Sequence, residues 1–384
     1  MRARLKVLTV FGTRPEAIKL FPLLHRLERD PRFVSRVCVS GQHRGMLKQV
    51  LELMDIAPDH DLRLMREGEY LNIFTSRFLA AIDPILQAES PDLVLVQGDT
   101  GTAFGAAMAA HYRRIPVAHV EAGLRSGNLD QPWPEEFNRK AIAALAHYHF
   151  APTARAREDL LAENVPAERI RVTGNTVIDA LYWMRDRLRC EPQLAGTAGE
   201  LEKLAAGRRI IGVTCHRREN LEGGIARIAA ALQAIAARKD VLIAFPLHPN
   251  PQVSGPMRAA LEERARIHLM EPLGYPDFIR LMDVSHFMLS DSGGVQEEAP
   301  ALGTPVLVMR KATERPEGIA AGTARLVGTD PARIVTEASR LLDDTGAHRS
   351  MANAHNPYGD GRAAERIVQV LARDRISHSI RQIS

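Results

Sequence analysis

The feature that most constrains the fold of this chain is a regular alternation of short apolar runs with longer segments of helical periodicity. The apolar runs lie at residues 5–11, 34–39, 93–97, 116–120, 148–151, 170–173, 210–214, 241–245, 267–270, 287–290 and 305–309. Near-continuous apolar runs are typical of parallel strands that helices cover on both faces. Two such series in succession predict an α/β fold made of two doubly wound, Rossmann-like domains with a central cleft.

The length of the chain agrees with this division. Its 384 residues suit two domains better than one. The segment TGNT at residues 173–176 separates the two series of strands. We therefore expect an N-terminal domain over residues 1–173 and a C-terminal domain over residues 174–365.

Charge and cysteine content exclude several classes of function. The formal net charge is only +4, and no Lys/Arg run is interleaved with aromatic residues, which argues against nucleic-acid binding. Cys38, Cys190 and Cys215 form no metal-binding spacing and read as free thiols of a reducing compartment. No apolar stretch is long enough for a secretion signal or a membrane span, so we expect a cytoplasmic protein that does not bind membranes.

Polar residues follow directly on many of the expected strands, where open parallel sheets bind their ligands. These residues are Arg14, Asp99, Glu121, His216, His248 and Ser292. No GxGxxG follows the first strand, and GxxxxGK[ST] does not occur in the sequence. Both absences argue against a nicotinamide-dependent enzyme or a P-loop enzyme.

The segment SDSGGVQEE at residues 290–298 combines a strand end, two glycines and a helix start. The free backbone N–H groups and the helix dipole at Gly293 and Gly294 predict a seat for phosphates. Glu297 and Glu298 are expected in the first turn of the helix. They either complement the dipole there, or one of them accepts hydrogen bonds from ribose hydroxyls.

The turn GTRPEA at residues 12–17 places a guanidinium at the start of the first helix. Arg14 at this turn and Lys19, somewhat more than one helical turn further on, are both able to reach a diphosphate. For Lys19 alone, simple solvent exposure explains the residue equally well.

Four carboxylates are candidates for acid–base chemistry. Asp99 either caps its helix or transfers protons. Glu121 follows a buried strand and precedes Ala-Gly, an unfavourable place for a purely solvated acid. Glu135 and Glu136 follow Pro-Trp-Pro at residues 132–134, and one of the pair could be a helix-start charge only.

His216 and Arg217 open a loop that suits phosphate contact and proton transfer. No HExxH and no Asp/Glu/His cluster of metal spacing accompanies them, so we expect no protein-held metal. Phe278 is placed to stack on a nucleobase or to pack in the core. The polar loops at residues 313–317 and 355–361 are further ligand candidates or simple turns.

Ten segments together resemble the bacterial non-hydrolysing UDP-N-acetylglucosamine 2-epimerases. They are FGTRPEAIK (11–19), GQHRGML (41–47), GDT (98–100), HVEAGLRSG (119–127), PWPEEFNR (132–139), TGNTVIDAL (173–181), CHRREN (215–220), SDSGGVQEEAPALGTPVLVMR (290–310), TERPEG (313–318) and NPYGDGRA (356–363). The resemblance runs from near residue 5 to near residue 370, with all segments in order.

This resemblance implies a GT-B-like fold whose C-terminal helix, residues 366–384, crosses back to the N-terminal domain. It implies an isomerase that interconverts UDP-GlcNAc and UDP-ManNAc without a cofactor, works as a homodimer and serves surface polysaccharide synthesis. The implied mechanism is anti elimination of UDP to 2-acetamidoglucal, followed by re-addition on the other face of C2. Such chemistry needs a base at C2, an acid at the departing oxygen and firm diphosphate binding.

The resemblance also carries roles onto individual residues. It implies catalytic roles for Asp99, Glu121, Glu135 and His216, with Asp99 at the C2 proton, His216 at the diphosphate, and Glu121 and Glu135 not divided between acid and base. The implied substrate contacts are Arg14, Lys19, Ser292, Gly293 and Gly294 to the diphosphate, Glu298 to the ribose, Phe278 to the uracil and Arg315 to the nucleotide.

Many members of this family bind a second UDP-GlcNAc beside the active site as an allosteric activator. Gln42, Glu136, Arg217 and His248 match that region. Gly45, Gly68 and Glu69 stand where some members carry larger amide or basic residues, and Gly101-Thr102-Ala103 replaces a common threonine run. These departures leave activation and the exact sugar specificity open.

Other functions share much of this pattern. One is a hydrolysing 2-epimerase that releases ManNAc and UDP, and another is a 2-epimerase of a UDP-diacetamido-uronic acid. A retaining GT-B glycosyltransferase would require an acceptor. A nucleotide-sugar binding module would bind UDP and turn nothing over.

Overall fold

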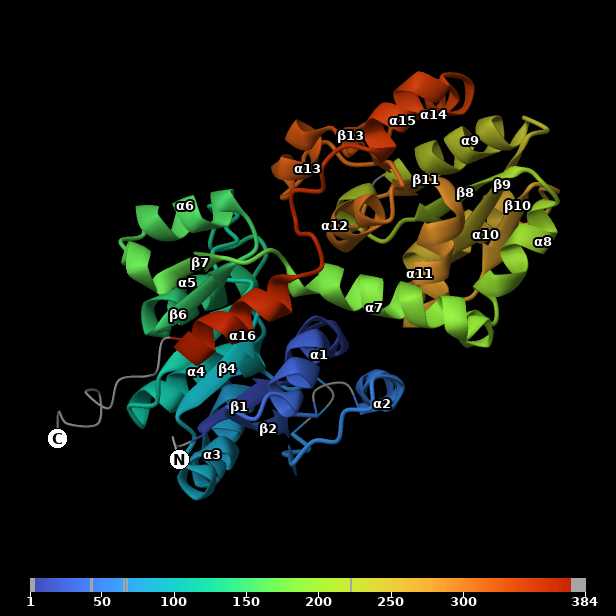
Figure 1. The fold of residues 1–384 in the computed structure, drawn as a ribbon. Helices are drawn as coiled ribbons and strands as arrows, with labels where there is room; N and C mark the ends of the chain where they lie inside the picture. Colours follow the sequence, from blue (N-terminus) through green and yellow to red (C-terminus); the bar gives the residue numbers. More distant parts are fainter. Residues whose placement is uncertain (1–3, 42–43, 65, 67, 222, 374–384) are drawn as a thin grey trace. The chain divides into compact units, whose positions relative to one another are not determined.

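A computed structural model describes residues 4–373 except residues 42–43, 65, 67 and 222. The described chain forms two compact units, each built around one parallel sheet with helices on its faces (Figure 1). The first unit comprises the chain up to Ala180 and the chain from Gly359 through the last helix, and the second comprises Leu181–Tyr358. The predicted fold class, two doubly wound α/β sheets, is confirmed.

The sheet of the first unit has the strand order β3-β2-β1-β4-β5-β6-β7, and every printed pairing is parallel. The order reverses between β1 and β4, so the loops after these two strands flank the topological switch point, where ligands bind in such sheets. The strands are β1 (Leu5–Phe11), β2 (Phe33–Val39), β3 (His60–Asp61), β4 (Leu93–Gln97), β5 (Val117–Val120), β6 (Tyr148–Ala151) and β7 (Ile170–Val172).

The helices of the first unit cover both faces of this sheet. They are α1 (Arg14–Arg29), α2 (Arg44–Leu53), α3 (Leu71–Glu89), α4 (Gly101–Tyr112), α5 (Glu135–Leu145), α6 (Ala154–Ala162) and α16 (Ala363–Arg373), with a short 3-10 helix η1 (Ala167–Arg169). The alanine-rich α4 lies close to α3, since a Cβ at Gly105 would stand 2.7 Å from the Phe78 ring. Asp99 lies in the turn between the carboxyl end of β4 and the start of α4, at the switch point.

The helix α7 (Thr176–Cys190) carries the chain from the first unit into the second. Asp179 in its first turn accepts hydrogen bonds from the backbone N–H groups of Ala363 (3.1 Å) and Ala364 (2.9 Å). These bonds satisfy the start of α16 and tie the first turn of α7 to the first unit. The two compact units therefore meet within α7, between Ala180 and Leu181. The domain boundary expected from the sequence lies after residue 173 and stays a prediction.

The sheet of the second unit has the order β10-β9-β8-β11-β12-β13, and its printed pairings are also parallel. Here the order reverses between β8 and β11. The strands are β8 (Arg209–Thr214), β9 (Val241–Pro246), β10 (Ile267–Met270), β11 (Ser285–Ser290), β12 (Val306–Val308) and β13 (Ala324–Leu326).

The helices of the second unit alternate with these strands. They are α8 (Leu201–Ala205), α9 (Gly224–Ala236), α10 (Pro251–Leu261), α11 (Tyr275–Val284), α12 (Gly293–Ala301), α13 (Pro316–Ala321), α14 (Pro331–Asp343) and α15 (Thr345–Ala352), with 3-10 turns η2 (Pro192–Ala195), η3 (Ala198–Glu200) and η4 (Arg218–Asn220). No helix of the described chain has the length and apolar character that a membrane span requires.

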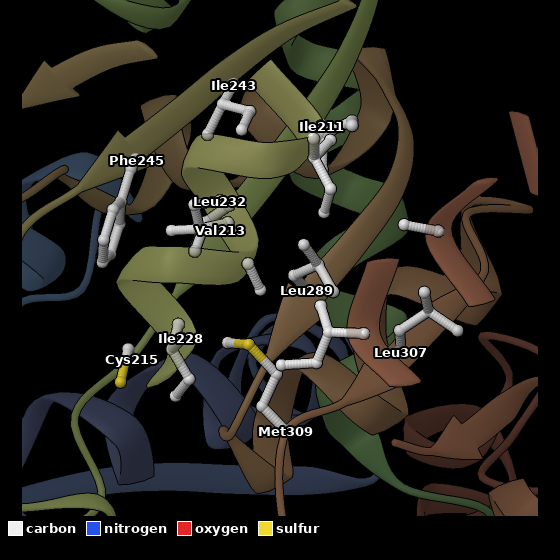
Figure 2. Packing of buried hydrophobic residues seen from close by; sticks show 14 of the residues in the cluster. Ile211, Val213, Cys215, Ile228, Leu232, Ile243, Phe245, Leu289, Leu307 and Met309 are labelled. Carbon is white, nitrogen blue, oxygen red and sulfur yellow. The ribbon is translucent and has the colours of Figure 1, made fainter. Parts of the chain in front are cut away.

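Side chains from β8, β9 and β11 interlock with those of α9 to form the largest core of the second unit (Figure 2). Val213, Leu232, Phe245 and Leu289 in this cluster are fully buried. Burial of apolar surface of this kind is the main stabilising term of such a layer. The core holds the carboxyl ends of β8 and β11 side by side, and these ends carry His216 and Ser292.

Most predicted strands coincide with observed ones, whereas β3 and β13 were not predicted. β3 consists of His60 and Asp61 only, and β13 is three residues long with Arg325 at its centre. Both lie at sheet edges, where pairing with a single neighbour suffices and no apolar run is needed. Their sequences therefore carry no strand signal.

Candidate active site

Glu16 joins the two turns at the switch point of the first sheet. Its Oε2 accepts hydrogen bonds from the N–H (2.8 Å) and the hydroxyl (2.7 Å) of Thr13, and its Oε1 accepts one from the Thr100 hydroxyl (2.8 Å). Burial raises the pKa of Glu16, and these hydrogen bonds oppose the rise. The turns locked in this way carry Arg14, at the start of α1, and Asp99, just before α4.

Glu121 directly follows β5 and is held by three donors. Lys19 Nζ lies 2.7 and 2.6 Å from its two carboxylate oxygens, Asn175 Nδ2 donates to Oε1 at 3.3 Å, and Gln97 donates to Oε2. Its backbone has φ of 64°, the left-handed region that non-glycine residues rarely adopt. Strained backbone of this kind clusters at functional sites. Lys19, predicted to contact a diphosphate, is an ion-pair partner of Glu121 in the structure.

Asp99 lies beside this cluster and is held from α5. Arg139 Nε donates to its Oδ2 at 2.9 Å, and Asn138 Nδ2 donates to its backbone carbonyl at 2.8 Å. Desolvation raises the pKa of Asp99; the nearby Glu121 adds to the rise, and Arg139 and Lys19 oppose it. Asp99 therefore combines a raised pKa with a side chain of which 32% remains exposed, as functional carboxyl groups often do.

The two acidic residues at the start of α5 have different surroundings. Glu136 is fully buried and accepts hydrogen bonds from the backbone N–H groups of Ser126 (3.1 Å) and Gly127 (3.2 Å) and from Arg139 (3.2 Å). Glu135 is half-buried, and its side chain makes no hydrogen bond or ion pair within residues 4–373 as described. Glu136 therefore holds the loop, and Glu135 is the more accessible of the two carboxylates.

At the second sheet, a buried carboxylate organises the loop after β8. Asp291 accepts hydrogen bonds from the backbone N–H groups of His216 and Arg217, both at 2.9 Å, and from Asn220 Nδ2 at 3.0 Å. The His216 ring pairs with the same carboxylate through Nδ1 at 3.0 Å. Burial alone would raise the pKa of Asp291, but the His216 ring and the backbone N–H groups hold it below its usual value.

The β11–α12 turn leaves backbone donors open at the start of α12. Ser292 N donates to the Ser290 hydroxyl at 3.0 Å, and within the described chain the Ser292 side chain makes no capping hydrogen bond. Gly293 and Gly294 form the first turn, so their N–H groups have no partner one helical turn before them. A Cβ at Gly293 would lie 3.0 Å from a carboxylate oxygen of Glu314, which favours glycine here. The turn has the geometry of an anion site.

The acidic pair of α12 lies beyond its first turn, because the helix begins at Gly293 and no acidic residue falls in that turn. The prediction that both occupy the first turn is wrong. Glu297 is buried and accepts a hydrogen bond from Arg315 Nε. Glu298 is half-buried and lies near Tyr275, whose pKa is raised by burial and by the charge of Glu298.

Phe278 on α11 is half-buried and packs against the core of α8, β8 and β9, as one of its two predicted roles requires. Stacking of its remaining surface on a nucleobase stays a prediction.

Of the residues predicted for a second nucleotide site, two gather beside His216. The ring of His248 stacks on that of His216, with centroids 5.6 Å apart, and Arg217 pairs with Glu314 at 2.9 Å. Burial, and then the proximity of His216, lower the pKa of His248. Glu136 is engaged in the first unit, and Gln42 lies outside the described residues.

Several polar residues of these two sheet edges were not singled out from the sequence: Glu16, Gln97, Asn138, Arg139, Asn175 and Asp291. Arg139 carried a local signal, since it stands four residues after Glu135 on one helix face. Asp291 lies inside the segment read as a phosphate seat. The described residues include no group of three or more His, Cys, Asp or Glu placed to hold a metal ion.

Comparison with known proteins finds full-length similarity to one family. The sequence profile described as UDP-N-acetylglucosamine 2-epimerase matches residues 25–372. The UDP-N-acetylglucosamine 2-epimerase of Salmonella typhimurium is 54% identical over 375 residues, covering 97% of this chain and 100% of the relative.

Solved structures agree with the sequence match. That of the UDP-GlcNAc 2-epimerase from Neisseria meningitidis bound to UDP-GlcNAc has a TM-score of 0.88 at 44% identity, covering 96% of this chain and 100% of that one. That of the Methanocaldococcus jannaschii enzyme with UDP-GlcNAc and UDP has a TM-score of 0.76 at 32% identity, with 96% and 100% covered.

Glu163, which caps the C-terminus of α6, pairs with Arg125 in the loop after β5. Arg125 Nη2 (2.7 Å) and Lys140 Nζ (2.6 Å) donate to its carboxylate. The hydrogen bond from Arg125, reinforced by Lys140 and opposed by burial, lowers the pKa of Glu163 from 4.5 to about 2.

Because the folded-state pKa of Glu163 is depressed, its contribution is complete above the unfolded pKa and is lost as pH falls toward 2. We expect Glu163→Gln to lower the free energy of unfolding by about 1–2 kcal/mol near pH 7, with the difference shrinking between about pH 5 and pH 2. Glu158→Gln, at an exposed position of the same helix, should change it by less than about 0.5 kcal/mol. Urea unfolding at several pH values measures both; a pH-independent deficit for Glu163→Gln would contradict the account.

Proposed function

The chain belongs to the UDP-N-acetylglucosamine 2-epimerase family, and from this premise we propose that it converts UDP-GlcNAc reversibly into UDP-ManNAc. The observation that carries the proposal is the arrangement at the first switch point. There Asp99, with a raised pKa, lies beside the Lys19–Glu121 pair and is oriented by Arg139. Inversion at C2 requires a proton to leave one face of the carbon and another to arrive on the opposite face, which needs tuned carboxyl groups.

The proposed reaction proceeds by elimination and re-addition. A base takes the C2 proton, the electron pair of the C2–H bond forms the C1=C2 double bond, and the C1–O bond breaks. Its electron pair leaves with the β-phosphate oxygen, giving UDP and 2-acetamidoglucal. UDP then adds back to C1, and C2 receives a proton on the other face. No electron enters or leaves overall, so the proposal needs no redox cofactor.

We assign the C2 proton transfer to Asp99, because burial raises the pKa of its carboxyl above that of a solvated aspartate. Glu121 and Glu135 share the remaining acid–base roles. Glu121 is fixed by its donors, whereas Glu135 is half-buried at the start of α5. Removing a proton from one face of C2 and delivering one to the other face requires two carboxyl groups, one held in orientation and one accessible.

We assign diphosphate binding on the second unit to the start of α12 together with His216, and the contact of Arg14 to the diphosphate stays a prediction. The N–H groups of Gly293 and Gly294 and the positive end of the helix dipole favour a diphosphate there. The ribose is assigned to Glu298, which half-burial leaves accessible, and the uracil to the side of Phe278. The nucleotide contact of Arg315 stays a prediction, and in the structure its Nε donates to Glu297.

Exposed apolar side chains on the first unit support a homodimer. Ile73 on α3 is 47% exposed, Phe137 on α5 is 50% exposed and Tyr112 on α4 is 74% exposed. They lie on three successive helices, and a contiguous apolar patch on such a face would mark an interaction surface. We expect the wild type to sediment at twice the mass of the chain, and Tyr112→Glu with Ile73→Glu to shift it toward the monomer. A wild type that sediments as a monomer at micromolar concentration would contradict the proposal.

The direct test is product analysis by NMR after incubation with UDP-GlcNAc. The wild type should form UDP-ManNAc with little free UDP; free ManNAc and stoichiometric UDP would indicate a hydrolysing enzyme instead. Asp99→Asn should lower turnover by about 10²-fold or more with UDP affinity preserved, because the proton carrier is lost and the fold is kept. Asp83→Asn, an exposed substitution on α3, is the control and should keep full turnover. A fully active Asp99→Asn enzyme would remove Asp99 from its assigned role.

A further inference from the structure

Asp291 stands between β11 and α12 with no exposed surface, and its two oxygens are used differently. Oδ2 accepts hydrogen bonds from the backbone N–H groups of His216 and Arg217 and from Asn220. Oδ1 faces the His216 ring, with Nδ1 at 3.0 Å, and also lies 3.1 Å from the backbone N of His216. One carboxylate therefore fixes both the main chain and the ring of a single histidine.

This geometry determines where the ring proton resides. A carboxylate accepts hydrogen bonds, so Nδ1 must carry the proton, and Nε2 is left as the nitrogen for other chemistry. Within the described residues Nε2 makes no hydrogen bond, and 34% of the His216 side chain is exposed. The ring of His248 lies alongside, with the two centroids 5.6 Å apart. The ring of His216 is thus held by a bond on one edge.

We propose that Asp291 is a positioning residue for His216, which presents Nε2 to the diphosphate oxygen that departs from C1. This inference rests on the proposed function and gives a role to Asp291, for which the sequence motifs implied none. In the imidazolium form, Nε2–H donates a hydrogen bond that strengthens as negative charge grows on the departing oxygen. The carboxylate on the far nitrogen fixes the orientation of the ring, so the ring need not reorient during the reaction.

A purely structural role for Asp291 makes a different prediction. Its bonds to Asn220 and to the backbone N–H of Arg217 hold the loop whatever the ring does. If Asp291 serves only the loop, its loss should be equally harmful with or without the histidine. If it acts through the ring, its loss should matter only while the histidine is present. A double-mutant cycle of Asp291→Asn and His216→Asn separates the two.

In this cycle we expect Asp291→Asn alone to lower kcat by about 10²-fold while KM for UDP-GlcNAc changes less than about fivefold. In the His216→Asn background the same substitution should lower kcat by less than about threefold. Equal losses in the two backgrounds would overturn the proposal and leave Asp291 as loop support. Wild-type protein unable to epimerise UDP-GlcNAc would instead contradict the proposed function.

A measurement on the wild type tests the bond without any variant or activity. ¹⁵N NMR of labelled histidine at about pH 9, where imidazoles are neutral, should show His216 protonated at Nδ1. Asp291→Asn should shift the proton to Nε2, because the amide N–H then donates to Nδ1. A wild-type His216 protonated at Nε2, with Nδ1 bare, would overturn the proposal even if the Asp291→Asn variant does not fold.

Discussion

Buried carboxylates that must be surrounded by hydrogen-bond donors determine how the loops of both sheets are arranged. Glu16, Glu121, Glu136 and Asp291 are each at most 7% exposed, and each accepts at least three hydrogen bonds. A buried charge without such partners costs several kcal/mol. The turns therefore close around these four groups, and the residues carried by the turns become fixed in position.

The same constraint separates support from chemistry at neighbouring positions. Glu136 is fully engaged by the loop it holds, while Glu135 beside it stays accessible. Glu297 is bound to Arg315, while Glu298 is less buried. In each pair the more buried carboxylate supports the structure, and the other is less buried. We infer that acid–base groups gather on the first unit and the anion seat on the second.

The sequence predicted eleven of the thirteen strands of the described chain and the polar residues that follow them, because strand periodicity and the residues after a strand are local signals. It could not show which polar residues meet. Lys19 and Glu121 are 102 positions apart, and His216 and Asp291 are 75 apart, so only tertiary packing pairs them. Whether Glu135 or Glu136 is buried depends on where α5 begins, at a boundary that a Pro-Trp-Pro loop leaves undefined in sequence. The polar edge strand β3 carried no signal at all.

The claim on which the functional account depends is that the C2–H bond is broken during turnover. Incubation of the wild-type protein with UDP-GlcNAc in deuterated water, followed by ¹H NMR and mass spectrometry, tests it most directly. The account predicts one deuterium at C2 in every molecule of UDP-ManNAc formed, and its gradual appearance at C2 of the returned UDP-GlcNAc. UDP-ManNAc that forms with its C2 proton retained would contradict the account.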